Sequence, residues 1–232
     1  MFVTGRHRAT IDALAKSIVA AGGAAEPAEV DALDEGCVED HLATIMATAG
    51  RIDVTFNAIS IPQQGIQGIP LVELPVDSFT LPVSTYTRTH FLTARAAARR
   101  MIEQRCGVIL MHTPEPARLG VPRVGGMGPA WAAMEGLSRS LSAELGAYGV
   151  RAVCLRSTGL PETDTIDVVF GLHAKVLGIT AQQFQAQIES LTHRRRSTTL
   201  QEVADAAVFI ASDRASAMTG TVANLTGGII VD

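Results

Sequence analysis

The chain of 232 residues is long enough for one domain with a substantial core, and its hydrophobic fraction of 47% suits a sheet that is buried on both faces. Its net charge of -4 gives no reason to expect a nucleic-acid partner, and no apolar run is long enough to cross a membrane. Cys37, Cys106 and Cys154 lack paired or metal-like spacing, which predicts free thiols, no metal site and a cytoplasmic location.

The N-terminal residues predict part of a βα unit. Residues 2–3 are typical of the end of a strand, and Gly5 is typical of the turn that follows it. A helix is then predicted to start at Thr10 or Asp12 and to stop at Gly22-Gly23, because apolar residues recur there at helical spacing. These apolar residues are Ile11, Leu14, Ala15 and Ile18.

Short apolar runs and helical stretches alternate over the rest of the chain. Strands are predicted to end at Val30 and to lie within 51–60, 107–113, 150–159 and 220–228. Helices are predicted to begin at Asp34-Glu35 and to cover 76–105, 128–149 and 199–215, with Pro82 as an interior kink or a late first turn. Because the strands are continuously apolar and alternate with helices, the pattern predicts a single α/β domain with a parallel, doubly wound sheet.

Four segments resemble the short-chain dehydrogenase/reductase family. They are GRIDVTFNAIS at 50–60, GVILMHT at 107–113, AAMEGLSRSLSAELGAYGVRAVCL at 132–155 and EVADAAVFIASDRASAMTGTVANLTGG at 202–228. The last is the most specific, because it resembles the family's C-terminal helix, its Ser-Asp-x-Ala turn and the Thr-Gly that begins the last strand. The resemblance covers nearly all of residues 1–232 and implies a Rossmann-like sheet.

The alignment with this family begins at the family's second strand. Family members start with a strand, a Thr-Gly-x-x-x-Gly-x-Gly turn that holds the cofactor pyrophosphate, and a helix, whereas MFVTGR resembles the strand that comes next. A first unit of about 30 residues is therefore expected to be missing from the given chain. The family's strand order, 3-2-1-4-5-6-7, implies that this loss leaves two interior strand edges unpaired. A start downstream of the natural one is the favoured explanation; the alternatives are a closed-up smaller sheet or a strand donated by another copy.

The resemblance also implies a degenerate proton relay. The family's Tyr-x-x-x-Lys pair aligns with Met127 and Trp131, and its serine aligns with Pro114. An unperturbed phenol is a poor base at neutral pH, so the family's chemistry needs that lysine. Thr113 and Tyr86 are the remaining catalytic candidates.

These two candidates have plainer interpretations. His112 and Thr113 lie at the end of a predicted central strand, where open α/β sheets place their sites, and Tyr86 stands where the family has a helix asparagine. Alternatively Thr113 forms a turn before the prolines, His112 is a satisfied polar residue and Tyr86 is a packed aromatic.

Four residues align with the family's cofactor contacts. Arg6 follows the first strand of this chain, where members that prefer NADP carry a basic residue for the 2′-phosphate. Asp31 aligns with the acceptor of the adenine amino group, and Asn57 and Ala58 align with the strand end beside the adenosine ribose. The resemblance implies NADP, with NAD as the alternative, or no cofactor if Met1 is the true start. Otherwise Arg6 is a solvated charge, Asp31 a turn or N-cap acid, and Asn57 a buried structural amide.

Residues 160–200 resemble the family's variable substrate loop. Two short helices are predicted, the first capped by Asp164 or Thr165 and the second by Thr180. Such a segment acts as a lid in enzymes or as an interaction surface, and the basic run at 193–196 is an anion site or a solvated helix end. The apolar underside is predicted to comprise Phe170, Leu172, Val176, Leu177, Phe184 and Ile188.

Two functions follow from these observations. The first is an NADP-linked oxidoreductase whose proton comes from water, Thr113 or Tyr86, acting on a small molecule less polar than a free sugar. The second is a non-catalytic binding or oligomer-stabilising protein. A homo-oligomer, dimer or tetramer, suits either function, because the helix from Ala130 to Gly149 resembles the one that family members pack against a partner subunit.

Overall fold

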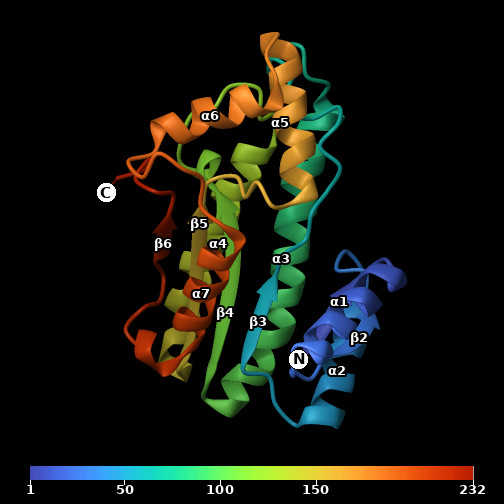
Figure 1. Ribbon diagram of the computed structural model, residues 1–232. Helices are drawn as coiled ribbons and strands as arrows, with labels where there is room; N and C mark the ends of the chain where they lie inside the picture. Colours follow the sequence, from blue (N-terminus) through green and yellow to red (C-terminus); the bar gives the residue numbers. More distant parts are fainter. Residues whose placement is uncertain (232) are drawn as a thin grey trace.

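The strands of this protein form two separate parallel sheets (Figure 1). The computed structural model describes residues 1–231. One sheet pairs β1 (Phe2–Gly5) with β2 (Glu26–Glu29), and the other has the order β3-β4-β5-β6. The second sheet consists of β3 (Val54–Asn57), β4 (Gly107–Pro114), β5 (Val150–Ser157) and β6 (Val222–Leu225). This arrangement confirms the predicted doubly wound α/β fold.

Helices connect successive strands. They are α1 (Arg8–Ala20), α2 (Glu35–Ala49), α3 (Val76–Gln104), α4 (Met127–Leu145), α5 (Asp164–Leu177), α6 (Ala181–Leu191) and α7 (Leu200–Ala211). Short 3-10 turns occur at η1 (Glu115–Ala117), η2 (Gly146–Tyr148) and η3 (Asp213–Ala215). No helix within residues 1–231 is both long and apolar enough to span a membrane.

The central strand β4 is apolar on both faces because helices cover both. Ile109 and Met111 pack into a core with α3 and α4, whereas Val108 and Leu110 pack into a second core with α7. Alternate residues of a strand point to opposite faces, so a strand buried on both sides reads as a continuous apolar run. The same reasoning applies to β5, from which Cys154 joins the first core.

The two sheets do not join into one. Among the described residues, β1 pairs only with β2, and β3 pairs only with β4. On β3 the side chains of Val54 and Phe56 stay 43% and 45% exposed. The alternative in which the remaining strands close up into one smaller sheet is therefore wrong. α2 packs against α3, with Arg99 Nη1 2.7 Å from Glu39 Oε1.

Several predicted helix boundaries need correction. α1 begins at Arg8, before Thr10 and Asp12, because the His7 carbonyl accepts backbone hydrogen bonds from the Thr10 and Ile11 amides at 3.0 and 3.2 Å. Pro82 lies inside α3, beyond the first turn, which agrees with the interior position that was one of its two predicted alternatives. The N-cap of α5 is Thr163 rather than Asp164 or Thr165, since it is Thr163 that has the extended backbone of a cap residue.

The next helix, α6, follows the prediction more closely. The Thr180 hydroxyl accepts from the Gln183 amide at 3.1 Å, and the Gln183 side chain accepts from the Thr180 amide at 2.9 Å. This capping box confirms Thr180 as the start of α6. The predicted apolar underside is too wide, because Val176 and Leu177 are each 47% exposed near the end of α5.

Candidate active site

A cavity of about 280 Å³ lies at the carboxyl ends of β3, β4 and β5. α5 and α6, the orange helices of Figure 1, lie across these strand ends and supply the outer wall. Ligands of open α/β sheets bind at the carboxyl ends of the strands, so this cavity is the candidate active site.

The walls of the cavity are mainly apolar. α4 contributes Met127, Trp131 and Met134, and α5 and α6 contribute Phe170 and Phe184, whose ring centroids lie 5.4 Å apart in an edge-to-face arrangement. No lysine or arginine lines the cavity among the residues that the structure describes. The cavity therefore favours a neutral, largely apolar ligand.

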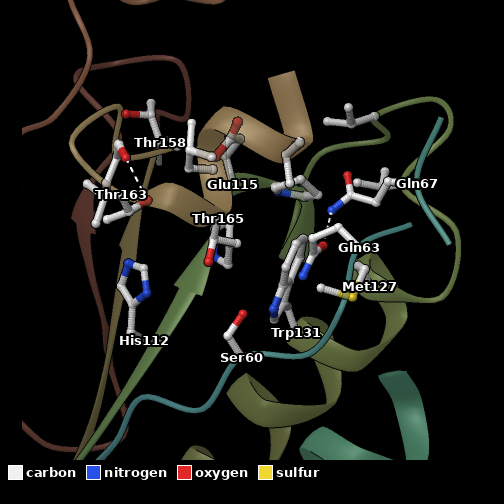
Figure 2. Close-up of a pocket in the computed structure, with 18 of the residues that line it drawn as sticks. Ser60, Gln63, Gln67, His112, Glu115, Met127, Trp131, Thr158, Thr163 and Thr165 are labelled. Atoms are coloured by element: carbon white, nitrogen blue, oxygen red, sulfur yellow. Dashed lines mark hydrogen bonds between the residues drawn. The ribbon is translucent and has the colours of Figure 1, made fainter. Parts of the chain in front are cut away.

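Met127 and Trp131 both face the cavity (Figure 2). They occupy the positions aligned with the Tyr-x-x-x-Lys pair, and neither side chain titrates. The Trp131 ring lies 6.5 Å from the ring of Tyr86, centroid to centroid, so these two aromatics share one wall.

Tyr86 is brought to the cavity by α3, but its hydroxyl is a weak acid there. Burial raises the pKa of Tyr86 to about 12, although hydrogen bonding from Trp131 and from the Ile61 backbone acts in the opposite direction. One turn further along α3, His90 Nδ1 lies 2.9 Å from the Tyr86 carbonyl oxygen, and burial lowers the pKa of His90 to about 4.

Thr113 lies outside the cavity. Its side chain is fully buried and donates a hydrogen bond of 3.0 Å to Glu135 Oε1. Glu135 also accepts from Arg156, with Nε 2.8 Å from Oε1 and Nη2 2.6 Å from Oε2. The structure thus separates Thr113 from Tyr86 and uses the Thr113 hydroxyl to complete a buried ion pair.

His112 faces the cavity in a single tautomer. Its Nε2 lies 2.8 Å from Ser157 Oγ, and the Ser157 hydroxyl donates its own hydrogen to the Thr158 carbonyl at 2.8 Å. His112 Nε2 must therefore donate, which leaves Nδ1 as an acceptor. Burial lowers the pKa of His112 to about 4, so the ring is neutral at neutral pH.

Glu115 is the residue that the sequence analysis missed. It begins η1 directly after β4, and it is the only carboxylate side chain among the described residues that line the cavity (Figure 2). Its Oε2 is shielded from solvent and has no hydrogen-bond partner among the described residues. Burial raises the pKa of Glu115 to about 7. An acidic residue between Pro114 and Pro116, immediately after an apolar strand, was the available signal.

A series of hydrogen bonds, each with a defined donor and acceptor, joins α5 to the loop after β3. His173 Nε2 on α5 donates to Gln67 Oε1 at 3.1 Å, because an amide oxygen only accepts. Gln67 in turn donates to Gln63 Oε1 at 2.7 Å (Figure 2). Gln63 donates to the Ile61 carbonyl at 2.6 Å. This series supplies amide and imidazole groups on one side of the otherwise apolar cavity.

A family model described as enoyl-(acyl carrier protein) reductase matches residues 1–229. The chain belongs to the short-chain dehydrogenase/reductase family of oxidoreductases. It is 28% identical over 221 residues to the uncharacterized oxidoreductase YxbG of Bacillus subtilis (strain 168), covering 95% of this chain and 77% of that protein. This likeness does not favour the non-catalytic alternative.

Two solved structures share the short-chain dehydrogenase/reductase fold at low identity. An NAD+-bound xylitol dehydrogenase is 22% identical with a TM-score of 0.91, covering 98% of this chain and 88% of that one. A gluconate 5-dehydrogenase from Burkholderia cenocepacia J2315, in complex with NADP and tartrate, is 24% identical with a TM-score of 0.83, covering 98% and 84%.

The four residues aligned with the family's cofactor contacts lie at or just after the carboxyl ends of strands. Asn57 and Ala58 line the cavity, and Asn57 is held by donating to Thr93 Oγ1 at 3.0 Å and accepting from the Ile59 amide at 3.1 Å. Arg6 and Asp31 follow β1 and β2, on the separate sheet.

The side chains of Arg6 and Asp31 differ in their contacts. Arg6 is exposed and makes no hydrogen bond or ion pair with the rest of residues 1–231. Asp31 Oδ1 accepts from the Leu33 amide at 2.9 Å, which is the turn role that the sequence analysis left open for this acid.

Proposed function

We propose that this chain is an NADP-linked oxidoreductase that interconverts a small, mainly apolar carbonyl compound and its alcohol. The observation that carries the proposal is the apolar cavity at the strand ends, in a chain of the short-chain dehydrogenase/reductase family, with no lysine or arginine among the described residues that line it. An anionic substrate group would find no lysine or arginine there to balance its charge.

The residues aligned with the family's cofactor contacts suit the adenosine half of a nicotinamide dinucleotide. Arg6 offers an unoccupied guanidinium for a 2′-phosphate, which supports NADP, and Asn57 and Ala58 stand where the adenosine end meets the cavity. When bound, such a cofactor supplies or accepts the hydride of the reaction. Structural neighbours bound to NAD+ and to NADP support the class of cofactor, and Arg6 is the reason for choosing NADP between them.

The proton of the reaction needs a source other than the usual phenol. Met127 and Trp131 replace the Tyr-x-x-x-Lys pair, and the Tyr86 hydroxyl has its pKa raised to about 12. We therefore infer that the usual proton relay is degenerate in this chain. The Phe170 and Phe184 rings supply apolar surface to the cavity, and the Gln67 and His173 groups orient a polar atom of the substrate.

Titration with NADPH and with NADH tests the proposed function. Trp131 is the only tryptophan of the chain and lines the cavity, so bound cofactor should quench its emission. Saturable quenching with NADPH preferred is expected, and Arg6→Gln should weaken NADPH binding about tenfold to a hundredfold while leaving NADH unchanged. Arg8→Gln is the matched control, because Arg8 pairs with Asp12 at 2.9 Å. Absence of saturation with either dinucleotide would contradict the proposal.

We also propose that the protein is a homo-oligomer built through α3 and α4. α3 and α4 pack against each other, and α3 keeps Leu81 and Phe91 48% and 46% exposed. Apolar side chains of this size on one helix are suited to a partner surface. Sedimentation equilibrium of the wild-type protein and of Phe91→Glu measures this, with a shift toward monomer expected for the variant.

A further inference from the structure

We propose that Glu115 is the acid–base group of the cavity, and that it gives its proton to the carbonyl oxygen of a neutral substrate during reduction and takes it back during oxidation. This proposal rests on the proposed function, because it names the group that exchanges the proton in that reaction. Glu115 has no counterpart among the residues that the family resemblance assigned.

The first argument is the position of Glu115. β4 runs directly into η1, so Glu115 follows the strand end at which His112 also enters the cavity. A Cβ added to Gly128 would lie 3.2 Å from the Pro116 carbonyl oxygen, which means that the first turn of α4 packs closely on η1. The residue before Gly128 is Met127, at the family's tyrosine position, and the residue before Pro116 is Glu115.

The backbone around Glu115 also fixes its position. Pro114 and Pro116 restrict φ on both sides, and the Glu115 carbonyl accepts from the Arg118 and Leu119 amides at 3.0 Å each. A side chain on such a backbone is preorganised toward the cavity, which is what proton transfer to a bound substrate requires.

The second argument is that no other described residue is seen to hold the buried carboxyl oxygen of Glu115. Glu135 is buried with three donors, two from Arg156 and one from Thr113, and is fully accounted for by that ion pair. Glu115 Oε2 is shielded from solvent with no hydrogen-bond partner among the described residues. Burying a carboxyl oxygen without a hydrogen-bond partner costs stability. A bound ligand whose oxygen accepts a hydrogen bond from the protonated Glu115 would supply that partner.

The third argument is the protonation equilibrium. Burial raises the pKa of Glu115 to about 7, so both forms of the carboxyl are populated at neutral pH, as acid–base catalysis requires. The other titratable groups that line the cavity are His112 on β4, Tyr86 and His90 on α3, and His173 on α5. Burial lowers the pKa of His90 and His112 to about 4 and raises that of Tyr86 to about 12, far from neutral pH, and it lowers the pKa of His173.

The chemical step balances with this one proton. As the substrate carbon accepts a hydride from a reduced nicotinamide, a C–H bond forms and the π electron pair of the carbonyl moves to its oxygen. That oxygen forms an O–H bond with the proton of Glu115, whose own O–H bond breaks to leave a carboxylate. The carboxylate then takes a proton from solvent, and oxidation of the alcohol reverses each event.

The experiment compares wild type, Glu115→Gln and Glu115→Asp in the full chain with NADPH and acetophenone, a neutral apolar ketone. Glu115→Gln is expected to lower kcat about 100-fold or more and to remove the pH dependence of kcat near pH 7, while NADPH affinity by Trp131 quenching stays unchanged. Glu115→Asp should keep part of the activity because it keeps an acid. Glu144→Gln is the matched control, since Glu144 is exposed on α4 and makes no ion pair with described residues.

Infrared difference spectra across neutral pH give a readout that does not depend on turnover. A carboxylic acid band should disappear on raising the pH of the wild type, and this change should be missing in Glu115→Gln but present in Glu144→Gln. Turnover that survives Glu115→Gln within twofold, or no such band in the wild type, would overturn the role of Glu115. A wild type that binds NADPH but reduces neither acetophenone nor any other neutral ketone would instead overturn the proposed function.

Discussion

Removal of the Arg156 charge should be the most destabilising single change in the centre of this fold. The side chains of Arg156 and Glu135 are each only 6% exposed, and two of the three hydrogen bonds to Glu135 come from Arg156. Arg156→Met keeps much of the side-chain length but leaves an ionised Glu135 buried with one hydroxyl donor, Thr113. Breaking a buried pair in this way costs about 3–5 kcal/mol, out of a total stability of about 5–15 kcal/mol for a domain.

The measurement is urea unfolding of the wild type and the variants, followed by Trp131 emission and by far-ultraviolet circular dichroism. The double variant Glu135→Met with Arg156→Met should recover most of the loss, because no buried charge remains. Arg99→Met is the control, since the Arg99–Glu39 pair is exposed and should contribute less than about 1 kcal/mol. Two results would contradict this prediction. One is a loss of unfolding free energy for Arg156→Met no larger than that for Arg99→Met, and the other is a loss for the double variant equal to the sum of the losses for Glu135→Met and Arg156→Met.

Three further predictions concern stability. Burial lowers the pKa of His90 to about 4, so the folded state does not take up the proton that the unfolded chain accepts below about pH 6.5, and stability should fall as the pH drops from there to about 4. His90→Gln should reduce that loss by up to about 3 kcal/mol in urea midpoints measured over this range; an unchanged slope would contradict it. Thr199→Ala removes the capping box of α7 and should lower the unfolding free energy by about 1 kcal/mol, whereas a neutral result would show that the cap does not matter. Gly149→Ala should be destabilising by more than about 1 kcal/mol, because φ is +75° and the added Cβ would lie 2.5 Å from the Arg105 carbonyl oxygen. Thermal melts compare this variant with Gly146→Ala, which has nothing within 4 Å of the added Cβ and should be neutral; equal effects at the two glycines would contradict the prediction.

The α/β fold was predictable from the sequence because the sequence signals for its strands and helices are local and repeated. The continuous apolar run of β4 requires burial on both faces, and the alternation of such runs with helices leaves a parallel, doubly wound sheet as the simplest arrangement. Local signals also placed a helix start at Asp34-Glu35 and a cap at Thr180, and in the structure a side-chain oxygen of Asp34 and of Thr180 accepts from a nearby amide. The start of α1 was predicted too late in the chain. Its N-cap residue, His7, makes no side-chain hydrogen bond that caps the helix, so the sequence holds no cap signal at this position.

The candidate site was decided by tertiary structure. Sequence alone placed Thr113 and His112 together at a strand end, but neighbouring residues of a strand point to opposite faces, so His112 enters the cavity while Thr113 turns into the ion pair of Glu135. The acidity of Glu115 is likewise a tertiary property, since burial by residues distant in the chain is what raises its pKa. Composition and periodicity determine which residues are buried, whereas only the assembled chain determines which buried polar atoms find partners.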